Sequence, residues 1–164
     1  MWGRAATIDY RVPMSVRAIG INHVAFDVRD LDEALEWWAR WFTFELRGRR
    51  RTMAFIDLGD QFVALTEVGG GAGGSGTAEG GRHVGLVVED KEALRDALRE
   101  AGEDVGRSGS LRVRDPSGNL IEIVDYRDVQ FSKSDAVLRG MGLGGLEKSP
   151  SAIDELRAKR LTGE

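Results

Sequence analysis

The sequence predicts an α+β fold of two tandem βαβββ modules, followed by a helical extension at the C-terminal end. The first observation behind this prediction is a repeat: the stretch 21–28 (INHVAFDV) reappears sixty residues later as 81–88 (GRHVGLVV). Each copy is a short, β-branched apolar run with a histidine near its start, which is typical of a buried strand. The second observation is that each copy precedes a helix pattern and further strand-like runs, so that the duplication covers roughly residues 17–126.

The first module, residues 17–68, begins with the strand that contains His23. Asp30 is predicted to cap a helix that runs from residue 31 to about residue 41 or 42. Apolar side chains at helical spacing occupy one face of this helix, which we expect to pack on a sheet: Leu31, Ala34, Leu35, Trp38 and Phe42. Three strand-like runs follow at about 44–50, 52–58 and 61–68, and Gly59-Asp60 joins the last two as a tight turn.

The second module, residues 82–126, repeats this order. After the strand at 83–88, Asp90 is expected to cap a helix over 91–101 that Gly102 closes. Further strands are predicted near 103–106, 110–114 and 119–125. The glycine-rich segment 69–81 between the modules is interpreted as a flexible linker or a mobile mouth loop. It is unlike a phosphate loop because it has no Lys-Ser/Thr ending and opens a strand.

Two segments lie outside the duplication. Residues 1–16 show no clear periodicity and are interpreted as an N-terminal arm. Residues 127–164 form the helical extension, with one short helix over 134–139 that Gly140 stops and a second that starts at Ser149-Pro150. We expect the second helix to pack on its own domain, the alternative being that it covers a dimer neighbour or closes over the functional site.

Length and composition restrict the possible function. A chain of 164 residues with 41% hydrophobic residues can bury the core of one globular domain. It contains no cysteine, which excludes disulfides, thiolate metal sites and a cysteine nucleophile. It has no apolar run of the ~20 residues that a membrane span needs and no signal region, so we expect a soluble, cytoplasmic protein without a membrane partner. A net charge of −4 argues against nucleic-acid binding, despite the basic run 47–51.

Alignment of the two halves predicts a metal site. It places His23 opposite His83, which are the two histidines of the chain, and Ala64 opposite Glu122. Glu122 lies within an apolar strand, where an ionised carboxylate costs several kcal/mol unless it is paired, hydrogen-bonded or bound to a metal. Two histidines and one carboxylate form a 2-His-1-carboxylate set, which suits one divalent ion per chain: Fe²⁺, Mn²⁺, Co²⁺, Ni²⁺ or Zn²⁺. The alternative is that these are satisfied core residues.

The motifs that carry these residues resemble those of the vicinal oxygen chelate superfamily. They are His-Val-x-Phe-x-Val-x-Asp-x-Asp-Glu-Ala-Leu at 23–35, His-Val-x-Leu-x-Val-x-Asp at 83–90, and Asp-Pro-Ser-Gly-Asn-Leu-Ile-Glu at 115–122. The superfamily includes glyoxalase I, methylmalonyl-CoA epimerase, extradiol dioxygenases, and fosfomycin- and bleomycin-resistance proteins. The resemblance implies that the paired modules form a cupped mixed sheet with a divalent metal on its floor. It also implies a homodimer, in which some members share cups between chains.

The resemblance assigns the metal ligands to His23, His83 and Glu122. The fourth ligand of glyoxalase I and the epimerase corresponds to Ala64, which cannot coordinate, and the nearby Glu67 points to the opposite face of its strand. This departure leaves the three-ligand arrangement of the extradiol dioxygenases. Both histidines are then metal ligands, so the acid–base residue is unassigned.

Strand parity gives two candidates for that acid–base residue. Asp27 has the same side-chain parity as His23, and Tyr126 follows the last strand of the second module. For Tyr126 the alternative is packing at the end of the strand.

The resemblance implies a metal-dependent enzyme that acts on a small substrate whose vicinal oxygens chelate the ion. The reaction would be of lyase, isomerase or ring-cleaving dioxygenase type. The main alternative is a non-catalytic small-molecule binding protein of the bleomycin-resistance type, which would hold its ligand in the cup without a metal. A third possibility is that the triad is a structural site in a regulatory or scaffold protein.

Overall fold

The computed structural model describes residues 21–69, 83–105 and 109–162. The predicted arm at 1–16 and the predicted linker beyond Gly69 lie outside the described residues. Among the helices that the structure describes, none is both long enough and apolar enough to cross a membrane.

The first module forms a four-stranded sheet with one helix. Its elements are β1 (His23–Val28), α1 (Leu31–Trp41), β2 (Leu46–Arg50), β3 (Met53–Asp57) and β4 (Phe62–Glu67). The strand order is β1-β4-β3-β2, with β1 parallel to β4 and the other pairs antiparallel. The predicted β-α-β-β-β order of this module is confirmed, and β1 lies at an edge of its sheet.

The second module forms a separate three-stranded sheet. Its elements are β5 (His83–Val88), α2 (Lys91–Glu100), β6 (Leu111–Arg114) and β7 (Leu120–Asp125), in the strand order β5-β7-β6. The strand expected near 103–106 is not found over residues 103–105, and residue 106 lies outside the described residues. Glu103 and Asp104 are exposed acidic residues with low strand propensity, which accounts for the difference.

The strand registers confirm the alignment of the two halves. In the first sheet Ala25, two residues after His23, lies opposite Ala64. In the second sheet Gly85, two residues after His83, lies opposite Glu122. Ala64 and Glu122 therefore occupy equivalent positions in the two modules.

The helices begin where the sequence predicts, and each has two carboxylate caps. The Asp30 side chain accepts a hydrogen bond from the Glu33 N–H at 2.8 Å, and Asp90 accepts one from the Ala93 N–H at 2.9 Å. A second carboxylate comes from the last residue of a strand, because Glu67 and Asp125 each accept a bond of 3.0 Å from the first helical N–H of their own module. Glu67 thus lies on the helix side of its sheet, as strand parity predicts.

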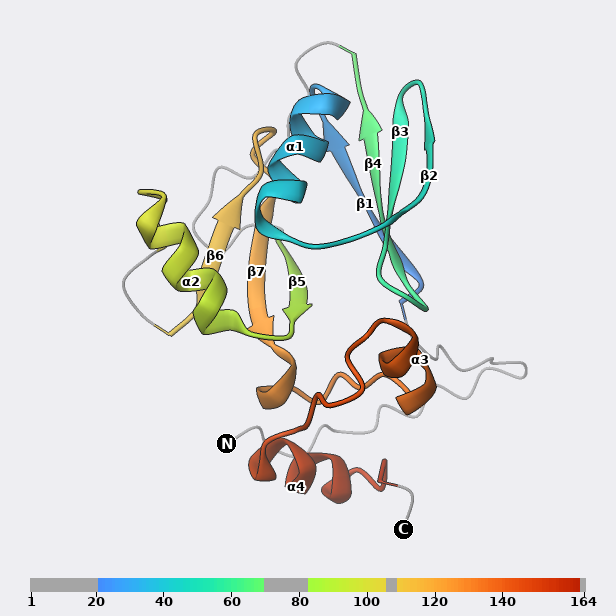
Figure 1. The fold of residues 1–164 in the computed structure, drawn as a ribbon, viewed down its shortest axis with the longest axis vertical. Coiled ribbons are helices and arrows are strands. Elements are labelled where there is room, and N and C mark those ends of the chain that lie inside the picture. Colours follow the sequence, from blue (N-terminus) through green and yellow to red (C-terminus); the bar gives the residue numbers. More distant parts are fainter. Residues whose placement is uncertain (1–20, 70–82, 106–108, 163–164) are drawn as a thin grey trace, which may run out of the picture.

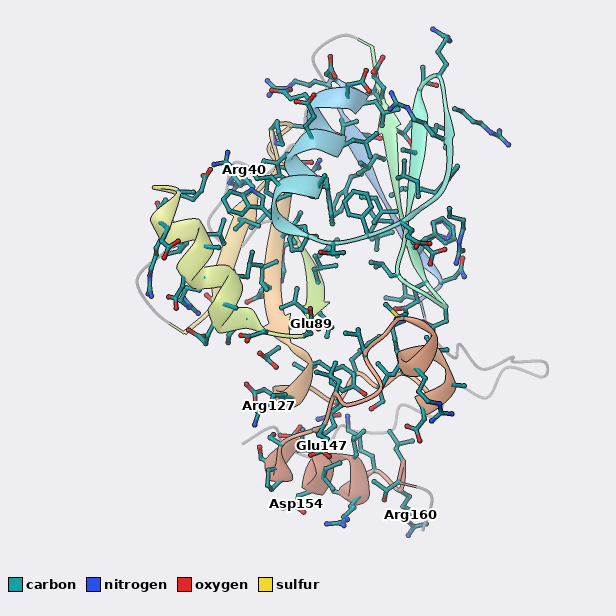
Figure 2. All side chains as sticks on the ribbon, viewed as in Figure 1. Arg40, Glu89, Arg127, Glu147, Asp154 and Arg160 are labelled. Carbon is teal, nitrogen blue, oxygen red and sulfur yellow. The ribbon has the colours of Figure 1, made fainter. Side chains whose placement is uncertain are left out.

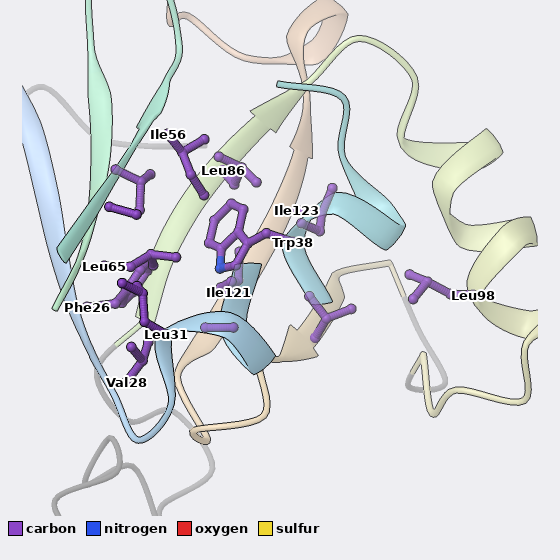
Figure 3. Close-up of a cluster of buried hydrophobic side chains, with 14 of the residues drawn as sticks. Phe26, Val28, Leu31, Trp38, Ile56, Leu65, Leu86, Leu98, Ile121 and Ile123 are labelled. Carbon is purple, nitrogen blue, oxygen red and sulfur yellow. The ribbon is translucent and has the colours of Figure 1, made fainter. Parts of the chain in front are cut away.

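The two sheets share one core around α1, which lies between them (Figure 1). Trp38 is 1% exposed, and its indole packs among Ile56 of the first sheet and Leu86, Ile121 and Ile123 of the second (Figure 3). We call the faces that carry these core residues the inner faces. Side chains alternate along a strand, so the residues between them lie on the outer faces. On the first sheet these include His23, Ala25, Asp27 and Ala64, and on the second His83, Gly85, Arg112 and Glu122.

A turn of the second module fastens it to the first. The hydroxyl of Ser117 accepts a hydrogen bond of 2.9 Å from the Arg29 N–H, just after β1. The amide of Asn119 donates to the Asp27 carbonyl at 3.0 Å. The buried Asp115 carboxylate holds this turn in shape, since it accepts bonds from the Ser117 N–H and the Asn119 N–H at 3.0 and 2.8 Å.

The extension contains η1 (Tyr126–Asp128), α3 (Asp135–Gly140) and α4 (Pro150–Ala158). Both predicted helices are confirmed, with Ser134 and Ser149 as N-caps and Pro150 at the start of α4. The extension packs on its own chain: Lys133 pairs with Asp60 in the β3–β4 turn, and α4 contacts η1. Charged side chains such as Arg127, Asp154 and Arg160 project from its outside (Figure 2).

Lys148 holds several backbone segments of the extension together through its ammonium group. Its ammonium donates to the carbonyls of Tyr126 and Val129 at 2.6 and 2.8 Å and to that of Phe131. It also lies 3.4 Å from the centroid of the Tyr126 ring. Desolvation by burial lowers the pKa of Lys148 below its ordinary value, and the charge of Asp125 acts in the opposite direction.

Candidate functional site

The outer face of the second sheet brings two of the three predicted ligands together. His83 Nε2 lies 3.1 Å from Glu122 Oε2, and the two side chains are 36% and 23% exposed. They meet because β5 and β7 are adjacent parallel strands in which Gly85, two residues after His83, lies opposite Glu122. On the other side, Arg112 of β6 lies directly opposite Glu122 in the antiparallel register, with its guanidinium 3.6 Å from Oε1.

The outer face of the first sheet places His23 in an aromatic setting. Its imidazole stacks on the Phe62 ring with centroids 4.6 Å apart and an angle of 9° between the planes. Nδ1 of His23 lies 3.0 Å from Oδ1 of Asn22. Arg47 lies over the same Phe62 ring at 4.9 Å and pairs with Asp57 at 3.1 Å. His23 is thus held by ring stacking at the exposed start of β1.

Within one chain the structure does not bring the three predicted ligands together. No group of three or more His, Asp or Glu side chains among the described residues could hold a metal ion. The reason lies in the topology, because α1 and the shared core separate the inner faces of the two sheets, so their outer faces open on different sides of the chain (Figure 1).

Both histidines nevertheless border one cavity of about 440 Å³, which lies between the start of β1, strand β5 and the extension. They reach it because β1 and β5 are both edge strands. Its wall is mostly apolar and includes Val63, Leu86 and Met141.

The two candidate acid–base residues occupy different environments. Asp27 is exposed near the end of β1, on the outer face that also carries His23. Tyr126 is 6% exposed in η1, beneath the ammonium of Lys148. Tyr126 also lines the cavity that both histidines border, so its candidate role stays a prediction.

Two further residues of the outer faces, Arg112 and Phe62, lie outside the sequence motifs of the predicted metal site. The sequence predicts the exposed position of Arg112, because Leu-Arg-Val-Arg at 111–114 alternates apolar residues, which are buried, with arginines, which are exposed. The sequence does not indicate a special position for Phe62, since an aromatic residue at the start of a strand is typical of any sheet.

The geometry of the His83–Glu122 pair fits a bound divalent ion. A nitrogen and an oxygen that each lie about 2.1 Å from an octahedral ion, at right angles, are about 3 Å apart. The 3.1 Å between Nε2 and Oε2 is compatible with this spacing, and it is equally the length of an ordinary hydrogen bond or ion pair. Imidazole and carboxylate are also the donors of the 2-His-1-carboxylate set. The second sheet thus supplies two adjacent donors that need a third from elsewhere.

Solved structures show similar folds. A possible glyoxalase from Bacillus cereus is 25% identical and covers 65% of this chain and 99% of its own, with a TM-score of 0.52. Lactoylglutathione lyase from Agrobacterium tumefaciens is 18% identical, covers 67% and 96%, and has a TM-score of 0.54. The fosfomycin resistance protein FosX from Listeria monocytogenes is 15% identical, covers 66% and 94%, and has a TM-score of 0.53.

At these identities the similarity establishes a shared fold, and no curated protein sequence matches the chain. The family model does identify the chain. The model of the Glyoxalase/Bleomycin resistance protein/Dioxygenase superfamily matches residues 20–123, a segment that covers most of both modules and contains all three predicted ligands. The chain therefore belongs to the Glyoxalase/Bleomycin resistance protein/Dioxygenase superfamily, the vicinal oxygen chelate superfamily that its motifs resemble.

Proposed function

We propose that the protein is a homodimeric, metal-dependent enzyme that acts on a small substrate with vicinal oxygens. The divalent ion would be held by His83 and Glu122 of one chain and His23 of the second. The observation that carries this proposal is the 3.1 Å pair of His83 and Glu122 on an outer face that His23 of the same chain does not share.

A second copy can supply the missing ligand because both histidines are accessible. His23 and His83 are exposed at the starts of β1 and β5, and these strands lie at the edges of their sheets. Docking the first module of one chain against the second module of another would place β1 beside β5 and bring His23 to the His83–Glu122 pair. Because this contact is reciprocal, a twofold dimer would contain two equal sites.

The bound ion would act as a Lewis acid on the chelating oxygens. The side chains of the protein would hold the ion, leave space for the substrate and transfer a proton. His83 and Glu122, which are paired across adjacent strands, would hold the ion from one chain, and His23, which is stacked on the Phe62 ring, would hold it from the second. Ala25 and Gly85, which are exposed, bring little bulk to the outer faces beside these ligands, and a Cβ added to Gly85 would have no atom within 4 Å. Asp27 is the candidate for a proton transfer because its carboxylate shares the outer face of His23.

A complementation experiment tests the shared site. Chains with His23→Ala and with His83→Ala would be coexpressed with different tags, and the mixed dimer would be purified and assayed for bound metal. A shared site predicts one intact site in each mixed dimer, whereas each variant alone retains none. The matched control is a mixed dimer of His83→Ala and Glu122→Ala chains. Both substitutions remove a ligand that the second module supplies, so each of the two sites lacks a ligand and the mixed dimer should bind no metal. A monomer in solution, or a mixed dimer without metal, would contradict the proposal.

The second candidate is a non-catalytic binding protein. The residue that favours it is Ala64, which occupies the position of Glu122 in the first module and has no donor atom. Phe55, whose ring centroid lies 5.8 Å from that of Phe62, adds a second aromatic side chain to the same outer face. Wild-type protein that binds no metal on titration with Mn²⁺, Fe²⁺, Co²⁺, Ni²⁺ or Zn²⁺ would support this second candidate.

A further inference from the structure

Arg112 is a cation on the outer face that carries the His83–Glu122 pair. It lies opposite Glu122 in the strand register, and its guanidinium is 3.6 Å from Glu122 Oε1. His83 contacts the other carboxylate oxygen, Oε2. At 3.6 Å the contact is longer than a hydrogen bond, and the Arg112 side chain is 41% exposed. The Arg112 side chain is therefore partly accessible to solvent beside the pair.

The charges of the site favour an anion. Glu122 and Arg112 balance each other in the chain by itself, since one carboxylate faces one guanidinium. A divalent ion held by His23, His83 and Glu122 would leave this set with two positive charges, counting Arg112. Such an excess attracts an anionic ligand, and a guanidinium binds a carboxylate or phosphonate through two parallel hydrogen bonds.

Space for such a ligand exists beside Glu122. Gly85 lies opposite Glu122 and between the outer-face residues His83 and Val87, and a Cβ added to Gly85 would have no atom within 4 Å. On this sheet the ligand groups are thus flanked by a gap at β5 and by a guanidinium at β6.

We propose that Arg112 determines the specificity of the site by binding an anionic group of the chelating substrate. The substrate is then a small oxyanion, a 2-hydroxy or 2-oxo carboxylate or the corresponding phosphonate, and not a neutral diol or ketone. This inference rests on the proposed metal site, and it assigns to Arg112 a contact with the substrate in addition to its contact with Glu122.

The test compares three probes that differ in charge and offer the same vicinal oxygens: glycolate, hydroxymethylphosphonate and the neutral hydroxyacetone. Binding to the 164-residue protein loaded with Mn²⁺ is measured by water-proton relaxation, in which a chelating probe displaces water from the ion. Arg112→Gln should weaken binding of the two anions about tenfold or more, the usual effect of losing a charge-assisted hydrogen bond. It should change hydroxyacetone binding less than twofold, and Arg112→Lys should retain part of the anion affinity.

Arg99→Gln is the matched control because it removes the same charge from an exposed position on α2, and it should leave all three probes unchanged. Comparison of glycolate with hydroxymethylphosphonate identifies which oxyanion the site prefers. Equal weakening of all three probes, or loss of Mn²⁺ affinity alone, would make Arg112 a positioning residue for Glu122 and overturn the proposal.

Failure of the metal site would be a different result. If the wild-type protein binds no Mn²⁺, glycolate binding is measured on the metal-free protein by saturation-transfer NMR. If Arg112→Gln then abolishes glycolate binding, the anion site exists without the metal. If Arg112→Gln leaves glycolate binding unchanged, the proposed role of Arg112 is wrong.

Discussion

The side-chain amide of Asn119 donates a hydrogen bond of 3.0 Å to the backbone carbonyl of Asp27, which lies 92 positions earlier in the chain. The same amide nitrogen lies 2.7 Å from Oδ2 of Asp115. Asn119 belongs to the Asp-Pro-Ser-Gly-Asn segment that marks the superfamily resemblance. In this chain that segment joins the two modules, because its Ser117 also binds the Arg29 N–H.

Asn119→Ala should therefore lower the free energy of unfolding by about 1–2 kcal/mol, since it removes two side-chain hydrogen bonds and leaves the Asp27 carbonyl without this donor. Urea denaturation measures the change. Ser132→Ala, which removes a long 3.4 Å bond on the exposed extension, is the control and should shift the midpoint little. An unchanged midpoint for Asn119→Ala would mean that the turn does not fasten the modules.

His83→Ala should abolish stoichiometric metal binding and leave the fold intact, because the side chain is 36% exposed on an outer face. Elemental mass spectrometry gives the metal content, and circular dichroism checks the fold. Asp27→Ala is the control: Asp27 lies on the outer face of His23 but outside the predicted triad, and this variant should retain its metal. A folded His83→Ala protein with unchanged metal content would refute the triad.

Ala64→Glu should tighten metal binding, because Ala64 occupies in the first sheet the position that Glu122 occupies in the second. An added carboxylate there would supply a fourth donor. Metal affinity measured by competition with a chelator checks this, and Ala64→Gln offers a neutral donor of similar shape. A folded Ala64→Glu dimer with unchanged affinity would show that position 64 is not beside the ion.

Lys148→Met should loosen the extension and destabilise the protein by about 2–3 kcal/mol, since three backbone carbonyls lose a charged donor. Limited proteolysis should then cut between η1 and α4 faster than in the wild type. Lys91→Met, which removes a lysine from the start of α2, outside the extension, provides the comparison. Equal cleavage rates in the two variants would argue against an organising role for Lys148.

The link between Asp60 and Lys133 should weaken in acid. The hydrogen bond from Lys133 lowers the pKa of Asp60 below its ordinary 3.8, against the smaller opposing effect of burial. A carboxyl with a depressed pKa in the folded state contributes stability above its unfolded pKa and loses it as the pH falls through the folded value. The Asp60→Asn and Lys133→Met double-mutant cycle should show coupling at about pH 6 and less at about pH 2.5. Coupling that stays constant over this range would contradict the assignment.

The sequence by itself determined the local elements and their duplication. Helix positions followed from caps such as Asp30 and Ser149, and the equivalence of Ala64 and Glu122 followed from aligning the repeats, which the strand registers confirm. These features depend on neighbours within one module, so periodicity and capping are sufficient to predict them.

The tertiary structure decided how the modules are arranged. Helix α1 packs between the sheets, and Trp38 contacts both of them (Figure 3). This packing depends on contacts between residues that are far apart in the sequence. Strand pairing within the second sheet brings His83, Glu122 and Arg112 together, whereas the packing of the two sheets leaves His23 on the outer face of the other sheet. Strand alternation indicates which side chains share a face within one sheet, whereas the relation between two sheets is set by how their inner faces pack.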